Sequence, residues 1–236
     1  GYADITSSDV VLEIGAGSGK LTEKLEKMAG KVYAIEKDRS LCNVLEGKCR
    51  STEVICGDVL TIDLPRFDKV VANLPYSISS GITFKLFDYD FKIGILMYQH
   101  EFAERMIAKP NTREYSRLSV STQYFSDVRI LEVVPRTAFH PRPRVKSAIV
   151  RITPREPPYD IHDMEFFFDF VTAVFTQRRK KMRNAILNTA QISRIDDVKR
   201  VVSSLPEEMM DKRPEELLPE ELAGLSNIIV STGLLR

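Results

Sequence analysis

Residues 69–80, KVVANLPYSISS, place an amide, a proline and a phenol within four positions at the end of an apolar run. Pro75 fixes its own φ angle and favours extended geometry in the residue before it, so the turn is stiff. Such a turn can aim the side-chain carbonyl of Asn73 and a backbone carbonyl at one point, beside the flat ring of Tyr76. Two acceptors and a platform suit a planar group that bears an NH₂, such as adenine.

The chemistry indicated by this arrangement is methyl transfer to an adenine amine. That amine is a poor nucleophile because its lone pair is delocalised into the ring. Acceptors for its two hydrogens favour a more pyramidal nitrogen and stabilise the positive charge that develops on it. The transfer also requires that the amine, the methyl group and the sulfur are aligned along one line. Read alone, the same residues also fit an ordinary strand end beside a core tyrosine.

A glycine-rich turn, GAGSG, follows the apolar run 10–14. Gly15 and Gly17 let the backbone approach a ligand closely. The GxGxG spacing is weaker evidence for a dinucleotide than GxGxxG would be. An amino acid that carries a sulfonium needs less of a phosphate cradle and tolerates Glu13 just upstream. A plain tight turn is the alternative.

Two acids end the next two predicted strands. Glu36 could accept both hydroxyls of a ribose, and Asp58 could accept from the amine of an adenine. Because the carboxyl ends of parallel strands meet at one edge of a sheet, the two acids and the glycine turn predict a site for an adenosine. S-adenosylmethionine and NAD both fit this site, and the strand that ends at Asn73 favours S-adenosylmethionine.

Strands that alternate with helices would bring these residues to one edge. The predicted strands are 10–14, 31–35, 53–56, 69–72 and 93–98, and the predicted helices are 20–28, 39–45, 82–87 and 101–108. Residues 118–125 fit either a helix or a strand, and 128–134 and 147–153 read as an antiparallel pair. We therefore predict an α/β fold of the class I (Rossmann-like) methyltransferase type, with a mostly parallel sheet and an antiparallel edge.

Three prolines within residues 153–160 mark a domain boundary. Beyond it, 166–177, 182–190, 198–203 and 219–229 have helical spacing. We predict two domains, an S-adenosylmethionine-binding domain over 1–154 and a small helical domain over 155–236.

The composition is that of a globular chain, with 236 residues, 43% of them hydrophobic, and a net charge of +1. The sequence shows neither a membrane span nor a signal peptide, so we expect a cytoplasmic protein. Three cysteines seven positions apart match neither a metal knuckle nor a disulfide framework, and we expect reduced thiols and no metal site. Two clusters of basic residues, around 136–155 and 178–183, indicate a polyanionic partner.

Taken together, these segments resemble the KsgA-type rRNA adenine dimethyltransferases, which depend on S-adenosylmethionine. The matching motifs are VLEIGAGSGKLT (11–22), Glu36, GDV (57–59), NLPYSIS (73–79), FHPRPRVKSAIV (139–150), FTQRRKKMRNAI (175–186) and RPEELLPEELAGL (213–225). The last two motifs favour this type over the erythromycin-resistance rRNA methyltransferases, a less close resemblance. The segment EFAERMIAKP and the predicted C-terminal helices are similar to those of archaeal members.

The resemblance implies dimethylation of two adjacent adenosines near the 3′ end of small-subunit (16S) rRNA, by a monomer that acts on a pre-30S particle and binds no membrane. It implies catalytic roles for Asn73, Leu74, Tyr76 and Phe139. It implies cofactor contacts for Glu13, Gly15, Ala16, Gly17, Glu36, Lys37, Asp58, Val59 and Asn73. It implies rRNA recognition by the helical domain 155–236. It implies RNA contacts for Arg136, Arg142, Arg144, Lys146, Arg178, Arg179, Lys180, Lys181 and Arg183.

Three alternatives remain at the level of sequence: a non-catalytic ribosome-assembly factor with the same fold, a 23S-type rRNA adenine methyltransferase, and an NAD-dependent oxidoreductase. One departure concerns the start of the chain. Relatives carry a basic leader with a G-Q-x-F-L-like motif, whereas this sequence starts at Gly1, nine residues before Val10. We expect a truncated sequence that binds S-adenosylmethionine weakly as given.

Overall fold

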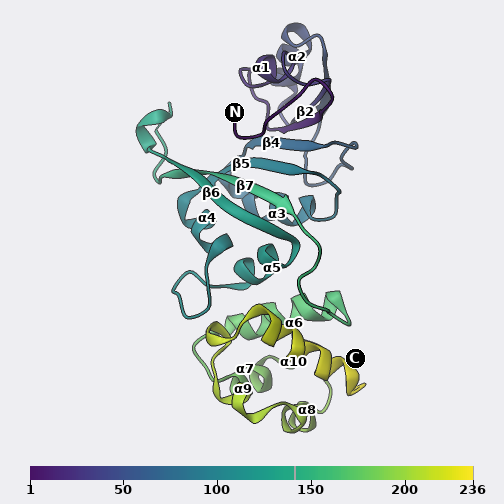
Figure 1. The fold of residues 1–236 in the computed structure, drawn as a ribbon, viewed down its shortest axis with the longest axis vertical. Coiled ribbons are helices and arrows are strands. Elements are labelled where there is room, and N and C mark those ends of the chain that lie inside the picture. The colour runs from purple at the N-terminus through teal and green to yellow at the C-terminus, as the bar shows by residue number, and fades with distance from the viewer. Residues whose placement is uncertain (141, 236) are drawn as a thin grey trace. The chain divides into compact units, whose positions relative to one another are not determined.

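The computed structural model describes residues 1–140 and 142–235 and forms two compact units (Figure 1). The first unit comprises Gly1–Glu104 with Ser126–Arg155, and the second comprises Arg105–Phe125 with Glu156–Arg236. The break after Arg155 lies one residue from the expected boundary. The segment 105–125, which the sequence pattern assigned to the first domain, groups with the second.

The first unit is built on a seven-stranded sheet with the order β3-β2-β1-β4-β5-β7-β6. The strands are β1 (Val10–Ile14), β2 (Lys31–Glu36), β3 (Thr52–Cys56), β4 (Lys69–Asn73), β5 (Ile93–Gln99), β6 (Ser126–Val134) and β7 (Ser147–Pro154). Neighbouring strands from β3 to β5 run parallel, whereas β7 is antiparallel to both β5 and β6. The predicted fold class, a mostly parallel α/β sheet with an antiparallel edge, is confirmed.

The central strands read as continuous apolar runs because both faces of the sheet are covered. Leu12, Val70 and Leu96, on three adjacent strands, have no exposed surface. The edge strand β6 mixes buried and exposed positions instead, and its pairing with β7 shifts by one residue between Ile130 and Glu132.

Helices of the first unit follow the strands. They are α1 (Thr22–Leu25), α2 (Arg39–Lys48) and α3 (Ser79–Leu86), with the 3₁₀ turns η1 (Tyr76–Ile78) and η2 (Arg136–Ala138), whereas the division between the units falls within α4 (His100–Ile107). The helix expected over 20–28 is only one turn long. The chain then returns to β2 through Gly30, where a Cβ atom would lie 2.3 Å from the carbonyl oxygen of Ser7, so only glycine fits. The segment 135–146 between β6 and β7 contains three prolines, as the sequence shows, and one of them, Pro141, lies outside the described residues.

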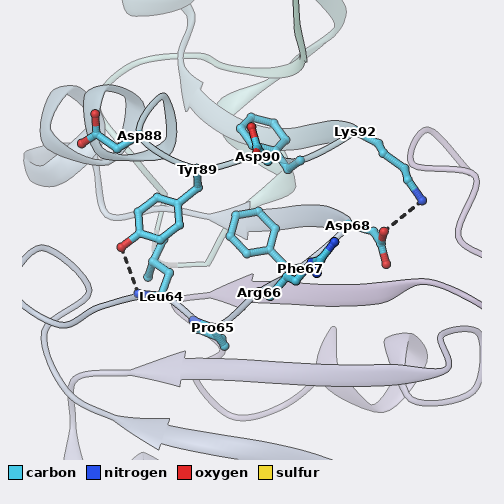
Figure 2. Close-up of a pocket in the computed structure, with 10 residues that line it drawn as sticks. Leu64, Pro65, Arg66, Phe67, Asp68, Asp88, Tyr89, Asp90 and Lys92 are labelled. Carbon is cyan, nitrogen blue, oxygen red and sulfur yellow. Dashed lines mark hydrogen bonds and ion pairs between the residues drawn. The ribbon is translucent and has the colours of Figure 1, made fainter.

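A cavity of about 580 Å³ lies at the amino ends of β4 and β5 (Figure 2). The loops 64–68 and 88–92, directly before these two strands, line it. Phe67 and Phe91 stack with ring centroids 5.8 Å apart, and the phenol of Tyr89 accepts a hydrogen bond from a backbone amide of the opposite loop at 3.1 Å. None of the residues that the sequence marked for chemistry lines this cavity.

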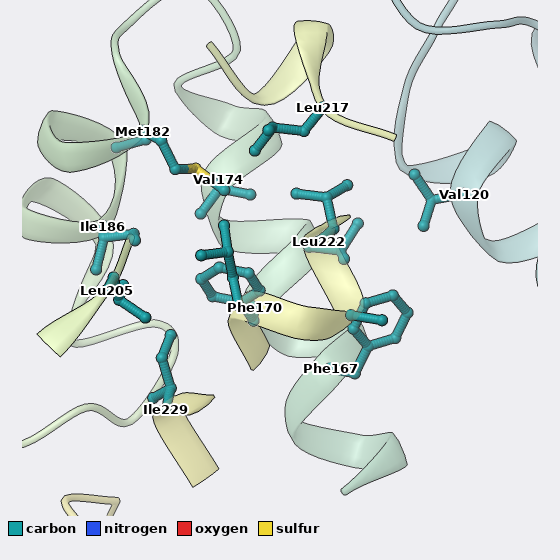
Figure 3. Close-up of a cluster of buried hydrophobic side chains, with 14 of the residues drawn as sticks. Val120, Phe167, Phe170, Val174, Met182, Ile186, Leu205, Leu217, Leu222 and Ile229 are labelled. Carbon is teal, nitrogen blue, oxygen red and sulfur yellow. The ribbon is translucent and has the colours of Figure 1, made fainter. Parts of the chain in front are cut away.

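The second unit is helical. Its elements are α5 (Arg117–Phe125), α6 (Met164–Thr176), α7 (Met182–Thr189), α8 (Val198–Ser204), α9 (Glu207–Asp211), η3 (Pro214–Glu216) and α10 (Pro219–Ser231). Its core is a cluster of fully buried side chains that includes Phe167, Phe170, Met182 and Leu222 (Figure 3). Among the described residues, no helix has both the length and the apolar character needed to cross a membrane.

Buried side chains explain why residues 105–125 belong to this unit. Tyr115 and Val120 are fully buried within the same cluster as Phe170. The phenol of Tyr115 donates a hydrogen bond to the carbonyl oxygen of Leu217 at 3.0 Å. The sequence pattern of residues 118–125 fitted a helix or a strand equally, so it could not reveal this packing.

Candidate active site

A second cavity, of about 280 Å³, lies at the carboxyl ends of the parallel strands. Its lining residues are Ile14, Gly15, Ile35, Glu36, Lys37, Gly57, Asp58, Val59, Asn73, Pro75, Ser77 and Ile78. The strand register places the carboxyl ends of these strands side by side. Ile14 pairs with both Ile35 and Ala72, and Glu36 pairs with Cys56. The strand order reverses between the adjacent strands β1 and β4, and ligands of open α/β sheets bind at such a switch point.

The glycine turn closes one side of this cavity. Gly15, Gly17 and Gly19 have φ angles of 74°, 58° and 81°, in the left-handed region that glycine adopts at little cost. A Cβ atom on Gly15 would lie 3.5 Å from the carbonyl oxygen of Asn73. The turn and the end of β4 therefore approach each other closely across the cavity wall.

Three backbone amides fix the carboxylate of Glu36. Its Oε2 accepts from Gly17 N at 2.9 Å, and its Oε1 accepts from Lys37 N at 2.8 Å and Asp38 N at 2.9 Å. A carboxylate has about four lone-pair sites, so acceptor capacity remains for a hydroxyl group of a ligand. The same bonds tie the glycine turn to β2, which preorganises both elements.

Asp58 lies across the cavity mouth from Lys37. Its Oδ2 accepts from Lys37 Nζ at 2.8 Å, and its Oδ1 accepts from Leu60 N at 3.0 Å. The hydrogen bond from Lys37, followed by that from Leu60, holds the pKa of Asp58 below its ordinary value. The carboxylate is thus ionised and available as an acceptor, and the exposed Lys37 ammonium can move aside for a ligand amine.

Glu13 and Ala16 do not line the cavity. Glu13 is buried, with 2% of its surface exposed, and neither its Oε2 nor Thr22 Oγ1 has a hydrogen-bond partner within the described part of the chain. Burial raises the pKa of Glu13 to about 7. Ala16 is buried in a small apolar cluster with Leu45. Ala16 belongs to the glycine turn and Glu13 is the second-last residue of β1, and both side chains are buried.

The Asn-Leu-Pro-Tyr segment forms the wall opposite the glycine turn. Asn73 is the last residue of β4 and is exposed, and Pro75 has a φ of −58°. Leu74 is buried and does not line the cavity. Tyr76 is half-buried, and its phenol oxygen lies 2.6 Å from Ser147 Oγ. The structure thus places Asn73 at the cavity and holds the ring of Tyr76 by its far end.

Phe139 and the basic loop before β7 are not part of the cavity lining. Phe139 is half-buried and directly follows η2. Arg136 donates to the carbonyl oxygen of Arg144 at 3.2 Å, which ties the two ends of the loop together. Arg142, Arg144 and Lys146 are all exposed.

The second basic cluster is largely engaged in ion pairs. Arg178 contacts Glu215 at 2.6 Å and donates to Arg113 O at 2.9 Å. Lys181 pairs with Asp211 at 2.8 Å, and Arg183 lies 4.0 Å from Glu207. Arg179 and Lys180 are exposed, and the described residues include no ion pair that involves either of them.

The expectation of three free thiols is wrong for two of them. Cys42 of α2 and Cys56 of β3 form a disulfide, and Cys49 is a buried free thiol whose pKa is raised by burial. The packing of α2 against β3 brings the two Cα atoms within 5.9 Å. Sequence spacing does not specify such connectivity, because it depends on tertiary contacts.

The fold and the site together define a Rossmann-like methyltransferase: the strand order places a glycine turn, two acids and an asparagine around one cavity. The chain belongs to the ribosomal RNA adenine dimethylase family, whose sequence model matches residues 2–220. The resemblance noted from the motifs is thereby confirmed.

Similar proteins agree with this assignment. The chain is 55% identical over 230 residues to a probable ribosomal RNA small subunit methyltransferase A of Methanococcoides burtonii, covering 96% of this chain and 85% of that protein. A protein of the same name from Methanosarcina mazei is 53% identical over 230 residues, covering 96% and 85%.

Solved structures give the same result. A dimethyladenosine transferase from Plasmodium falciparum is 31% identical with a TM-score of 0.86, covering 99% of this chain and 94% of that one. The 23S rRNA methyltransferase ErmE is 27% identical with a TM-score of 0.66, covering 97% and 94%.

Sequence reasoning missed several lining residues. Ile35 and Gly57 directly precede the two acids, and Ser77 and Ile78 directly follow Tyr76. Their positions next to predicted site residues were the available signal. Their types alone indicate no chemistry, since isoleucine and serine are common at strand ends and in turns.

Proposed function

We propose that this chain transfers methyl groups from S-adenosylmethionine to the exocyclic amines of two adjacent adenosines near the 3′ end of small-subunit rRNA. The observation that carries the proposal is the convergence of the glycine turn, Glu36, Asp58 and Asn73 on one cavity, in a chain of the ribosomal RNA adenine dimethylase family. The names of the archaeal relatives and of the Plasmodium structure support the small-subunit substrate and the dimethyl product.

The residues at the cavity fit S-adenosylmethionine. Glu36 retains acceptor capacity for ribose hydroxyls, and Asp58 is kept ionised for the adenine amine. Gly15 leaves open the space that a Cβ atom would fill beside Asn73, which suits the methionine portion. Lys37 and Val59 would flank the adenine. When bound, the cofactor supplies a methyl group on a positively charged sulfur.

The target amine would be activated by Asn73. The side-chain oxygen of Asn73 and a backbone carbonyl of the stiff turn would accept the two amine hydrogens, which stabilises the positive charge on nitrogen as the methyl arrives. The main chain of Leu74 belongs to this turn. The ring of Tyr76 would support the base, and Phe139 would complete the stack from the loop before β7. Orientation of the amine supplies the rest of the rate enhancement.

The partner in this proposal is small-subunit rRNA within a pre-30S particle, bound by a monomer in the cytoplasm. The domain boundary near Arg155 would separate chemistry from RNA recognition by the helices. Arg142, Arg144 and Lys146 would contact phosphates from the first unit. Because Arg178 and Lys181 are already paired, Arg179 and Lys180 are the stronger candidates for phosphate contacts in the second.

The test is methyl transfer from labelled S-adenosylmethionine to immature small subunits. We expect the wild-type protein to methylate them and Asn73→Ala to lower the rate by 10²-fold or more, roughly the effect of losing one preorganised transition-state contact. Asn43→Ala is a matched control, because Asn43 is exposed on α2 and does not line the cavity.

Digestion of the product RNA and mass spectrometry of its nucleosides would identify the dimethyladenosines. Wild-type activity in Asn73→Ala would overturn the mechanism. Binding to the particle without methylation would instead identify a non-catalytic assembly factor.

A further inference from the structure

The phenol of Tyr76 is hydrogen-bonded to a fully buried serine at the start of β7. Tyr76 Oη lies 2.6 Å from Ser147 Oγ, and Ser147 has no exposed surface. Tyr76 opens η1, just beyond the strand that ends at Asn73, whereas Ser147 is the first residue of β7. The two residues are 71 positions apart, so the bond ties the active-site turn to the antiparallel side of the sheet.

Ser147 is itself held from both sides. In the sheet register it pairs with Gln99 of β5 and with Val134 of β6. One residue earlier, the carbonyl oxygen of Lys146 accepts from the amide of His100 at 3.0 Å. The 3₁₀ turn η1, by contrast, has no side-chain cap at its start. The serine is therefore the rigid partner, and the tyrosine is the part that needs to be fixed.

We propose that Ser147 is a positioning residue for the Tyr76 ring during methyl transfer. The inference rests on the proposed function, in which this ring supports the target adenine. A tyrosine ring is oriented by two side-chain torsions, and a hydrogen bond at the phenol end restricts both, because the backbone already fixes the other end. Ser147 acts on the adenine only through Tyr76.

The position of Ser147 gives the bond a second consequence. Ser147 directly follows the basic loop 136–146, whose residues are proposed to contact phosphates. The same serine therefore fixes two parts of the site: the Tyr76 ring that supports the base, and the end of the RNA-binding loop. A substrate bound to the loop would meet a ring that is already aligned.

The test is a double-mutant cycle between the two partners. Tyr76→Phe and Ser147→Ala each remove the bond and keep the ring and the strand. We expect each change to lower kcat about tenfold, the size of one lost hydrogen bond. The KM for S-adenosylmethionine, and the calorimetric affinity for S-adenosylhomocysteine, should stay within about twofold of wild type. Because both changes remove the same bond, the double variant should be no slower than either single variant.

Tyr98→Phe is the matched control. It removes the Tyr98–Thr83 hydroxyl pair, whose oxygens lie 2.8 Å apart and are buried in the same unit. We expect this variant to lose thermal stability and to keep its kcat. The inference is overturned by wild-type kcat in Ser147→Ala, by an equal loss in Tyr98→Phe, or by losses that multiply in the double variant. A wild-type protein that transfers no methyl group refutes the proposed function and, with it, this inference; the two failures are thus distinguishable.

Discussion

The acids at the carboxyl ends of the strands differ in how their carboxylates are satisfied. Glu36 and Asp58 lie at the cavity mouth, and fixed amides or an ammonium bind their oxygens. Glu13 is buried beneath the glycine turn with one oxygen unpartnered among the described residues. An ionised carboxylate is costly in such a position, which explains its raised pKa. The first two acids are therefore suited to ligand contact, whereas Glu13 is buried and does not line the cavity.

Glu13→Gln should change the pH dependence of stability. Burial raises the pKa of Glu13 from 4.5 to about 7, so the folded protein retains a proton that the unfolded chain releases between these values. Folded protein binds more protons there, and its free energy of unfolding falls as pH rises, by ~3 kcal/mol in total. Glutamine keeps the shape and removes this titration. Urea unfolding from pH 5 to pH 8 should show the variant gaining stability relative to wild type as pH rises.

Parallel pH profiles for the two proteins would contradict this account of Glu13. Glu23→Gln serves as the control, since Glu23 is partly exposed and paired with Lys48 at 3.1 Å. It should leave the pH dependence of wild type nearly unchanged, because exposed ion pairs contribute little to stability.

Among the elements, α2 and β3 are joined covalently beside the candidate site. The Cys42–Cys56 bond closes a loop with a sequence separation of 14 residues, and Asp58 lies just beyond its end. In the absence of reductant, thiol titration of the unfolded chain should detect only Cys49. Reduction should detect three thiols and lower the free energy of unfolding by about 3 kcal/mol, the chain-entropy value for a loop of this length. Three thiols before reduction would show that the bond does not form.

The elements that the sequence predicted well are those whose signal is local. The strands 10–14 and 69–72 are apolar runs, and a parallel sheet covered on both faces requires such runs. The polar residues at their ends were then placed at one edge by topology alone. The helix at 117–125 and the disulfide could not be predicted, because both depend on contacts between segments far apart in the chain.

The candidate site shows the same division. Glu36, Asp58 and Asn73 carry polar groups at strand ends, so their types and spacing predicted their convergence. Glu13 has the same type and a similar position, but it is buried and does not line the cavity. Alternation along a strand was too weak a signal to predict this difference in a sheet covered on both faces. The bond between Tyr76 and Ser147 joins residues 71 positions apart and leaves no trace in a local pattern.

On the scale of the whole molecule, each compact unit carries a basic cluster, although the net charge is only +1. Local potential rather than net charge attracts a polyanion. In the second unit Arg178 and Lys181 are paired with the acids Glu215 and Asp211, so less of their charge is available to attract RNA. Arg179 and Lys180 are exposed and have no ion pair among the described residues, so their charge is available to a polyanionic partner.

Replacing Arg179 and Lys180 together with alanine should therefore weaken rRNA binding without loss of stability. Each phosphate contact contributes close to one unit to the slope of log K against log salt concentration, so the slope should become shallower by about 1 to 2. Binding titrations at several salt concentrations would measure it. Lys199→Ala with Arg200→Ala is the matched control, because these exposed bases on α8 carry the same charge outside the cluster. Equal slopes for both double variants would mean that the helical unit attracts rRNA by its total charge and not through the 179–180 pair.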